Sequence, residues 1–191
     1  IVDQIASALQ VAHRNGVIHR DLKPANILLD DDKNCYLADF GIAKDLEQFT
    51  DFSKVEEQGL MGSPDYISPE QIMMNPVTPQ TDVYSFGLML YKILTGHKPF
   101  EGNDLSTLIS KHLMEELPHL SIVRPDLPAD LNEVIQIATQ KDPTQRYESA
   151  VDVANALREA LKKTGDTVLS ELDHRSKPAF DLSDLGLSTD T

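Results

Sequence analysis

The sequence predicts a mainly α-helical domain that carries one small β-hairpin. Apolar residues recur at helical spacing in the first fifteen residues and again at residues 104–117, 130–140 and 148–161. A further segment, Thr81–Thr95, is apolar on nearly every face, which places it at the centre of the fold. Two short strand-like runs supply the hairpin. At 191 residues, the chain has the length of one ordinary domain with a real core.

Composition narrows the class of protein. The chain has 31 acidic and 17 basic residues and a formal net charge of −14, so no general surface for nucleic acid or anionic membrane is expected. Its single cysteine, Cys35, excludes an intrachain disulfide framework and fits a reducing compartment such as the cytoplasm. Because Cys35 has apolar neighbours in a predicted strand, we expect it to be buried in packing rather than reactive.

Membrane and targeting segments are not evident in the sequence. No apolar run approaches the length of about 18 residues needed to span a bilayer, and no signal peptide is recognisable. The chain starts in the middle of a helical pattern at Ile1. We therefore expect it to have been cut from something longer, and anchoring of that longer protein in a membrane stays open.

The first helix is predicted from Ile1 to Asn15, with Gly16 as its stop. His13, in its last turn, has no partner motif and is expected to be a solvated helix residue. The apolar positions follow helical spacing, at Ile1, Ile5, Ala8, Leu9 and Ala12.

A hairpin is predicted from two strand-like runs, residues 26–29 and 35–38, which flank a polar turn at residues 30–34. Asn26 begins the first run and Asp39 follows the second. The hairpin should therefore bring Asn26 and Asp39 to the same edge of the domain.

A polar loop precedes this hairpin. It places Asp21, Lys23 and Asn26 within six residues, and Pro24 breaks any helix there. With Asp39 at the same edge, the region offers two acids and an amide able to hold a hard cation, beside a lysine. This combination suggests magnesium-dependent phosphoryl transfer.

Three motifs together carry a family resemblance. The run His19–Asn26, with the triplet Asp39–Gly41, closely resembles the catalytic loop and Asp-Phe-Gly motif of protein kinases. The segment Gly62–Glu70 ends in Ser-Pro-Glu and looks like that of the bacterial, eukaryotic-like (Hanks-type) Ser/Thr kinases. The resemblance covers residues 1–161 and implies the large, C-terminal lobe of the α+β kinase fold. No Gly-x-Gly-x-x-Gly occurs, so the small β-rich lobe is expected to be absent and to precede Ile1.

The resemblance implies roles for the residues of the site. Asp21 would align the attacking hydroxyl and accept its proton, and Lys23 would offset charge on the γ-phosphate. Asn26 and Asp39 would hold Mg²⁺ on ATP, and Leu28 would form the apolar floor under adenine. A lysine at position 23 is similar to the Ser/Thr class. The implied activity is transfer of the ATP γ-phosphate to Ser or Thr hydroxyls of proteins.

The same resemblance implies structural or regulatory roles for further residues. His19 has the chemistry of a general base, but the resemblance implies that it packs beneath the site. Arg20 would receive a phosphate from an activation segment, where Thr50 and Ser53 are candidate acceptors, although hydroxyls are common in acidic loops. Ser63 takes the place of a threonine whose hydroxyl would contact the catalytic aspartate and lysine.

The remaining expectations concern the helical part of the chain. Glu70 resembles an acid that pairs with a distant arginine, here Arg146, in a structural role. Asp82 opens the apolar helix, so its burial would be costly without bonds, and the resemblance implies that it holds the backbone of the catalytic loop. Gly96 should cap that helix. Residues 162–191 lose all periodicity and read as an acidic linker or tail.

Two other functions stay open at this stage. One is a non-catalytic docking or scaffold module, a pseudokinase-like lobe, and the other is a small-molecule phosphotransferase. The intact metal and base residues favour the kinase. Ala25 lacks the acid that some kinases use for basic substrates, while the overall acidity mildly favours a basic peptide partner. Without its small lobe, the chain alone is expected to have no measurable kinase activity.

Overall fold

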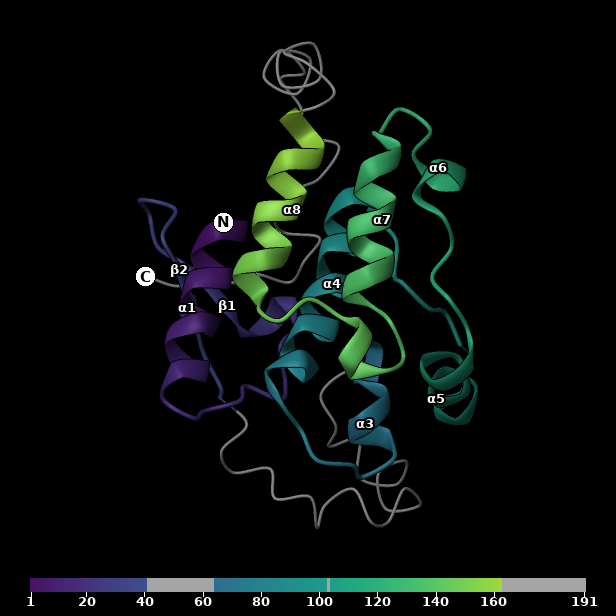
Figure 1. Ribbon diagram of the computed structural model, residues 1–191, viewed down its shortest axis with the longest axis horizontal. Coiled ribbons are helices and arrows are strands. Elements are labelled where there is room, and N and C mark those ends of the chain that lie inside the picture. Colours follow the sequence, from purple (N-terminus) through teal and green to yellow (C-terminus); the bar gives the residue numbers. More distant parts are fainter. Residues whose placement is uncertain (41–63, 103, 163–191) are drawn as a thin grey trace.

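The computed structural model describes residues 1–40, 64–102 and 104–162, which are mostly helical with one two-stranded sheet (Figure 1). The predicted mainly α class is therefore confirmed. In chain order the helices are α1 (Val2–Arg14), α3 (Pro69–Ile72), α4 (Pro79–Thr95), α5 (Leu105–Met114), α6 (Leu120–Val123), α7 (Ala129–Ala138) and α8 (Ala150–Lys162). The strands are β1 (Ile27–Leu29) and β2 (Cys35–Leu37), and short 3₁₀ helices lie at η1 (Pro24–Asn26), η4 (Pro64–Tyr66) and η5 (Pro143–Gln145).

Helix α4 forms the centre of the core, as its apolar sequence predicts. Helices α6, α7 and α8 pack on it together with η4 and η5. Thr78 and Thr81 form a reciprocal capping box at its N-terminus. At its C-terminus Gly96 adopts φ 75°, the left-handed conformation of a glycine cap. The largest side chains with no exposure include Tyr84, Phe86 and Leu88 of this helix.

Helices from the two ends of the described chain lie side by side (Figure 1). Helix α1 packs against α8 and against β2, and α8 packs in turn against α7. Ile5 and Leu9 of α1 are buried, as the predicted apolar face requires. The contact with β2 ties the hairpin to the helical core.

The hairpin pairs β1 with β2 in antiparallel register, with Ile27 opposite Leu37, Leu28 opposite Tyr36 and Leu29 opposite Cys35. Ile27 and Leu29 are buried, whereas Leu28 and Tyr36 are exposed on the other face. Cys35 is half-buried rather than buried, and it packs against the core. Burial raises the pKa of its thiol, which disfavours the reactive thiolate as expected.

Some boundaries differ from the predictions. The helix expected over residues 104–117 ends at Met114, because Glu115 is extended and Pro118 disfavours helix in the residue before it. Single-turn helices α3 and α6 are too short to produce a detectable apolar period. The predicted sites Thr50, Ser53 and Ser63 lie outside the described residues. The predicted tail, residues 162–191, also lies outside them except for Lys162, which is the last residue of α8.

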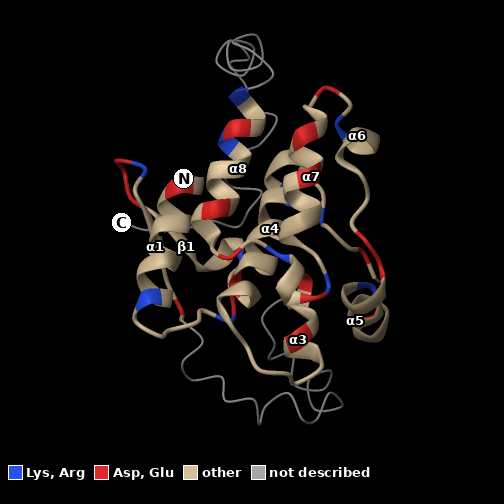
Figure 2. Ribbon diagram, viewed as in Figure 1, with Lys and Arg blue, Asp and Glu red and all other residues tan. Residues whose placement is uncertain are grey.

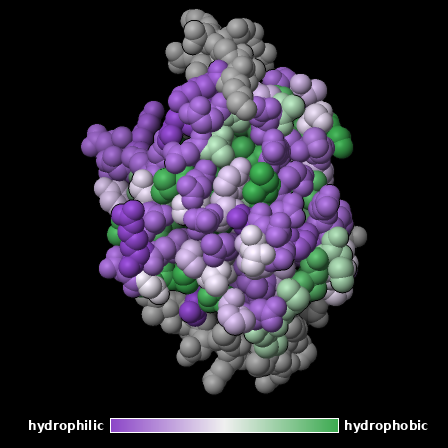
Figure 3. Space-filling model, in the orientation of Figure 1, coloured by the Kyte–Doolittle hydropathy of each residue, from purple (hydrophilic) through white to green (hydrophobic). Residues whose placement is uncertain are grey.

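The surface is consistent with the composition. Figure 3 shows a mainly hydrophilic face with apolar residues scattered over it. In Figure 2, acidic residues appear on several elements, including α7 and α8. Within the described ranges, no helix has the length and hydropathy required to cross a bilayer.

Candidate active site

The catalytic loop gathers Asp21, Lys23 and Asn26 around one carboxylate. Pro24 starts the single 3₁₀ turn η1, which brings Asn26 back beside Asp21. The Asn26 Nδ2 group donates to the Asp21 carbonyl at 2.7 Å and to Asp21 Oδ2 at 3.3 Å. Lys23 Nζ donates to the same Oδ2 at 3.0 Å. The side chains of Lys23 and Asp21 are 15% and 18% exposed, so both are shielded yet open to a substrate.

The hairpin places Ala38, the residue before Asp39, beside Asn26. The Ala38 N–H donates to the Asn26 carbonyl at 2.9 Å, which continues the strand pairing by one residue. Asp39 follows directly and has φ 52°, a left-handed backbone that costs energy for a residue other than glycine. Such conformations occur where the surrounding structure holds a functional residue in place. Leu28, which is 40% exposed, lies on the open face of the same hairpin.

The chemistry of Asn26 and Asp39 fits a nucleotide-bound Mg²⁺. In the part of the chain that the structure describes, no three His, Cys, Asp or Glu side chains are grouped to hold a metal by themselves. Mg²⁺ rarely needs such a cage, because it keeps water and takes one or two protein ligands plus phosphate oxygens. Among the described residues, both hydrogen bonds of the Asn26 side chain use Nδ2, which leaves Oδ1 as the acceptor for a cation.

His19 packs beneath the loop as a structural residue. It is fully buried, and its ring lies 4.6 Å from that of Phe40. Nε2 lies 3.0 Å from the Ala38 carbonyl, which it can contact only as a donor, while Nδ1 accepts the Asp21 N–H at 3.4 Å. Burial lowers the pKa of His19, which favours the neutral imidazole that these contacts require. With both ring nitrogens engaged, His19 is not placed to act as a general base.

Asp82 holds the backbone of the loop from below. Its carboxylate is fully buried at the start of α4. Oδ2 accepts the His19 N–H at 2.8 Å, and Oδ1 accepts the Arg20 N–H at 2.9 Å. On the other side, Gln71 Nε2 donates to the Arg20 carbonyl at 2.8 Å. These bonds fix Arg20 at φ 66°, a strained conformation next to Asp21.

His13 does not behave as the sequence predicts. Its side chain is 5% exposed rather than solvated, and Nε2 lies 2.7 Å from Asp82 Oδ2. The prediction failed because the last turn of α1 meets the first turn of α4, and these residues are 69 apart in the sequence. Local spacing carries no signal of such a contact.

Glu70 and Arg146 form a buried, two-pronged ion pair. Arg146 donates to the two carboxylate oxygens at 2.7 and 2.9 Å, and both side chains are almost fully buried. Its other donors reach the carbonyls of Gln80, Gln140 and Lys141. Burial raises the pKa of Glu70, but the hydrogen bonds and charge of Arg146 outweigh it and lower that pKa overall. The pair ties α3, which follows η4, to the segment before α8.

A buried histidine in α5 escaped the sequence analysis. His112 lies with its Nδ1 3.2 Å from the Tyr84 hydroxyl and its ring 5.0 Å from Phe100. Burial, and then the charge of Lys141, lower the pKa of His112 to about 4. The pattern of α5 predicts only an amphipathic helix, in which one polar residue on the buried side carries no distinct signal.

The protein should lose stability in mild acid because of His112. A histidine whose folded pKa lies below its unfolded value favours folding less as the pH falls through the unfolded value near 6.5. Between pH 8 and pH 5 the free energy of unfolding should fall by about 2 kcal/mol through this group. Denaturant titrations at both pH values should show this fall in the wild type, and His112→Asn should lack it. If the free energy of unfolding depends on pH equally in both proteins, His112 is not the cause.

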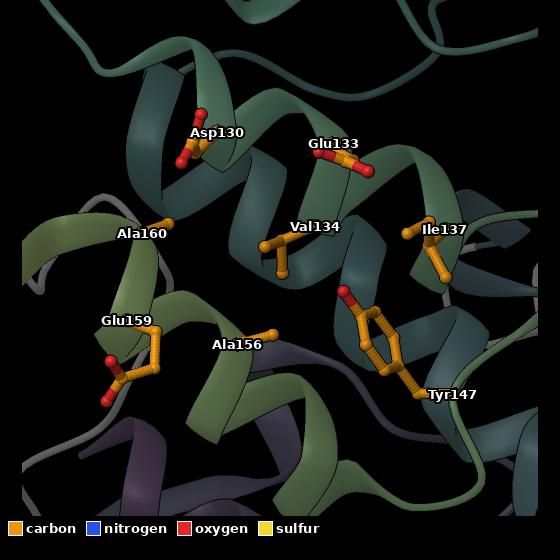
Figure 4. A pocket seen from close by; sticks show the side chains of 8 residues that line it. All are labelled: Asp130, Glu133, Val134, Ile137, Tyr147, Ala156, Glu159 and Ala160. Atoms are coloured by element: carbon orange, nitrogen blue, oxygen red, sulfur yellow. The ribbon is translucent and has the colours of Figure 1, made fainter. Parts of the chain in front are cut away.

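The described cavity lies away from this loop. It measures about 200 Å³ between α7 and α8, and none of its lining residues belongs to the catalytic loop (Figure 4). Asp130, Glu133 and Glu159 contribute three carboxylates to its lining, beside the Tyr147 ring. This cavity therefore takes no part in the candidate active site.

Comparison with known proteins agrees with the geometry. The family profile described as protein kinase domain matches residues 1–161. Serine/threonine-protein kinase PknH of Mycobacterium bovis is 38% identical over 177 residues, which is 93% of this chain and 29% of that protein. Serine/threonine-protein kinase PrkC of Bacillus subtilis is 39% identical over 161 residues, covering 84% of this chain and 24% of PrkC.

A solved structure gives the same result. The crystal structure of the Mycobacterium tuberculosis PknI kinase domain superposes with a TM-score of 0.63 at 31% identity, over 83% of this chain and 53% of that one. The chain thus spans about a quarter to a third of these curated relatives and about half of the solved kinase domain. The match over residues 1–161 shows that the chain belongs to the protein kinase domain family.

Proposed function

We propose that this chain is the large lobe of a Ser/Thr protein kinase that transfers the γ-phosphate of ATP to Ser or Thr hydroxyls of proteins. One observation carries the proposal: the Asp21 carboxylate is held by Lys23 and Asn26 on a backbone that Asp82 fixes. A scaffold has no need for a carboxylate, a lysine and a metal-binding amide brought together in this way. The names of the relatives support the same reading.

The residues of the loop have distinct roles in phosphoryl transfer. ATP with Mg²⁺ supplies the activated phosphoryl group and neutralises part of its charge. Asp21 orients the acceptor hydroxyl and takes its proton as the bond from that oxygen to the γ-phosphorus forms and the bond to the leaving oxygen breaks. Lys23, 3.0 Å from Asp21, offsets negative charge on the transferred group. Asn26 and Asp39 would hold the cation, and Leu28 would contact adenine.

Residues outside this chain complete the catalytic domain in this proposal. The chain covers about half of a solved kinase domain of the family. A small lobe would cover the nucleotide and form the hinge that binds adenine. Arg20 would receive a phosphate from Thr50 or Ser53, and Ser63 would contact Asp21 and Lys23. ATP supply places such an enzyme in the cytoplasm, and the acidic charge favours basic protein segments as substrates.

The substrate class is tested by offering two kinds of hydroxyl to the full-length protein. With ATP and Mg²⁺, a basic Ser/Thr-containing protein and a mixture of small alcohols are presented side by side. We expect label on the protein alone, and none on either acceptor from the 191-residue chain by itself. Label on the small alcohols would favour a small-molecule phosphotransferase, and activity of the isolated chain would refute the need for a second lobe.

A further inference from the structure

The cavity between α7 and α8 combines an apolar interior with an acidic border. The side chains of Val134 and Ala156 and the ring of Tyr147 point into it (Figure 4). Three carboxylates border it, among them that of Glu133, and no Lys or Arg side chain of the described ranges lines it. The interior therefore suits an apolar stem, and the border suits a positive charge at the end of that stem. Long cationic side chains have this composition.

The surroundings of Tyr147 favour arginine over lysine. Burial, and then the negative charge of Glu133, raise the pKa of the Tyr147 hydroxyl, so the carboxylate acts on the space beside the ring. A cation that enters this space is attracted both by Glu133 and by the face of the aromatic ring. The planar guanidinium of arginine can stack on a ring and bond a carboxylate, whereas the ammonium of lysine is a strongly hydrated point charge. The chemistry of the cavity therefore fits an arginine side chain best.

The size of the cavity favours one side chain from a tethered segment. It measures about 200 Å³, whereas pockets for drug-sized ligands span about 300–1,000 Å³. A pocket for one side chain binds a separate partner weakly, because a single contact must offset the whole loss of translational and rotational freedom. A segment of the same chain avoids most of that cost, since tethering gives it an effective concentration on the order of millimolar.

The sequence after α8 supplies a basic segment within reach. Helix α8, which forms one wall of the cavity, ends at Lys162. The run His174–Lys177 reads His-Arg-Ser-Lys and holds two of the three Lys and Arg residues in 163–191, a stretch that is otherwise acidic. Its Arg175 lies thirteen residues after Lys162, a length that spans about 43 Å when extended. Ala156 lies only about 9 Å back along α8, so the segment can return to the cavity without strain.

We propose that the run His174–Lys177 docks in the α7–α8 cavity, with Arg175 as the side chain that enters it. The guanidinium lies against the Tyr147 ring and the Glu133 carboxylate, and the methylene stem covers the apolar interior. The docked run folds the tail back on the helical lobe, at a cavity that contains no residue of the catalytic loop. The inference is independent of the proposed function, because it requires no phosphoryl transfer.

Trypsin measures this docking, because the protease must bind the Arg175 side chain itself to cleave the bond to Ser176. Cleavage of a segment that opens and closes rapidly follows the fraction of molecules in which it is open. In the full-length protein under native conditions, we expect this bond to be cleaved about tenfold more slowly than in a synthetic peptide of residues 170–180. Mass spectrometry of the released fragments gives both rates.

Three variants, each shown to be folded by circular dichroism, assign the effect to the cavity. Glu133→Gln removes a carboxylate at an exposed position, and Ala156→Leu fills the apolar interior. Both should bring cleavage after Arg175 to within about twofold of the peptide rate. Glu101→Gln removes an exposed carboxylate outside the cavity and should leave the slow rate unchanged. If the wild type is cleaved as fast as the peptide, or if neither cavity variant accelerates cleavage, the inference is overturned.

Carbodiimide coupling identifies the occupant of the cavity, because the reagent joins a lysine amine to a carboxylate that touches it. In a mixture of ¹⁵N-labelled and unlabelled full-length protein, we expect Lys177 to couple to Glu133 or Asp130 of the same chain. Coupling between a labelled and an unlabelled chain would show that a second copy fills the cavity. Coupling of these carboxylates to lysines of an added basic protein, with Lys177 uncoupled, would show a separate partner. Either result would overturn the proposal.

Discussion

Replacing Asp21 by asparagine in the full-length protein is expected to lower kcat by about 10²- to 10⁴-fold, with KM for ATP close to that of the wild type. Asparagine keeps the shape of the side chain and can still accept the Lys23 and Asn26 hydrogen bonds, at 3.0 and 3.3 Å from the carboxylate. It cannot take a proton from the attacking hydroxyl. The loss should therefore fall on the chemical step rather than on nucleotide binding.

Steady-state rates at saturating and limiting ATP measure this separation. Asp31→Asn supplies a matched control, because it removes an exposed carboxylate in the hairpin turn of the same region. Its kcat should equal that of the wild type. A kcat for Asp21→Asn within a few-fold of wild type would remove Asp21 from the role of proton acceptor.

Removing the Arg146 guanidinium, in Arg146→Met, should destabilise the protein by about 3–5 kcal/mol. The change leaves the buried Glu70 carboxylate with Thr81 as its remaining described side-chain donor, at 2.8 Å. It also removes the donor to the carbonyls of Gln80, Gln140 and Lys141, which Arg146 bonds. An uncompensated buried charge accounts for most of the expected loss.

Urea denaturation of three variants distinguishes this cause from lost packing. The double variant Glu70→Leu/Arg146→Met removes both charges and should recover much of the stability. Arg158→Met breaks an exposed ion pair with Asp3 and should leave the stability nearly unchanged. If the double variant is no more stable than Arg146→Met, the unpaired charge is not the source of the loss.

Acid should weaken the same pair in the wild type. The folded pKa of Glu70 lies below its unfolded value, so the stabilisation from Arg146 is complete above about pH 4.5. It is lost as the pH falls through the folded pKa. This loss lies at lower pH than the one expected from His112, so the two can be separated in one pH series.

The sequence predicts most of the fold and the inner part of the site for definite physical reasons. Apolar periodicity reveals α1, α7 and α8, because each has a face that must be buried, and α4 stands out because it is apolar on nearly every face. Asp21, Lys23 and Asn26 lie within one loop, so their proximity follows from chain connectivity. The strand pairing at Asn26 and Ala38 follows from two short apolar runs that flank a polar turn.

What sequence reasoning missed depends on contacts between distant segments. His13 reads as an ordinary polar residue at the end of a helix, and its partner Asp82 becomes visible only when α1 and α4 are packed together. His112 is concealed in the same way within α5, facing Tyr84 and Phe100. Neither residue carries a local signal, because histidine is intermediate in its preference for burial.

The most direct test of the kinase assignment is transfer of labelled phosphate from ATP by the full-length protein, with Asp21→Asn and Asp39→Asn assayed beside it. We expect label on serine and threonine of protein substrates, dependent on Mg²⁺ and lost in both variants, because one lacks the proton acceptor and the other a metal ligand. A folded wild-type protein that binds its partners but transfers no phosphate would contradict it, and the large lobe would then be a docking module.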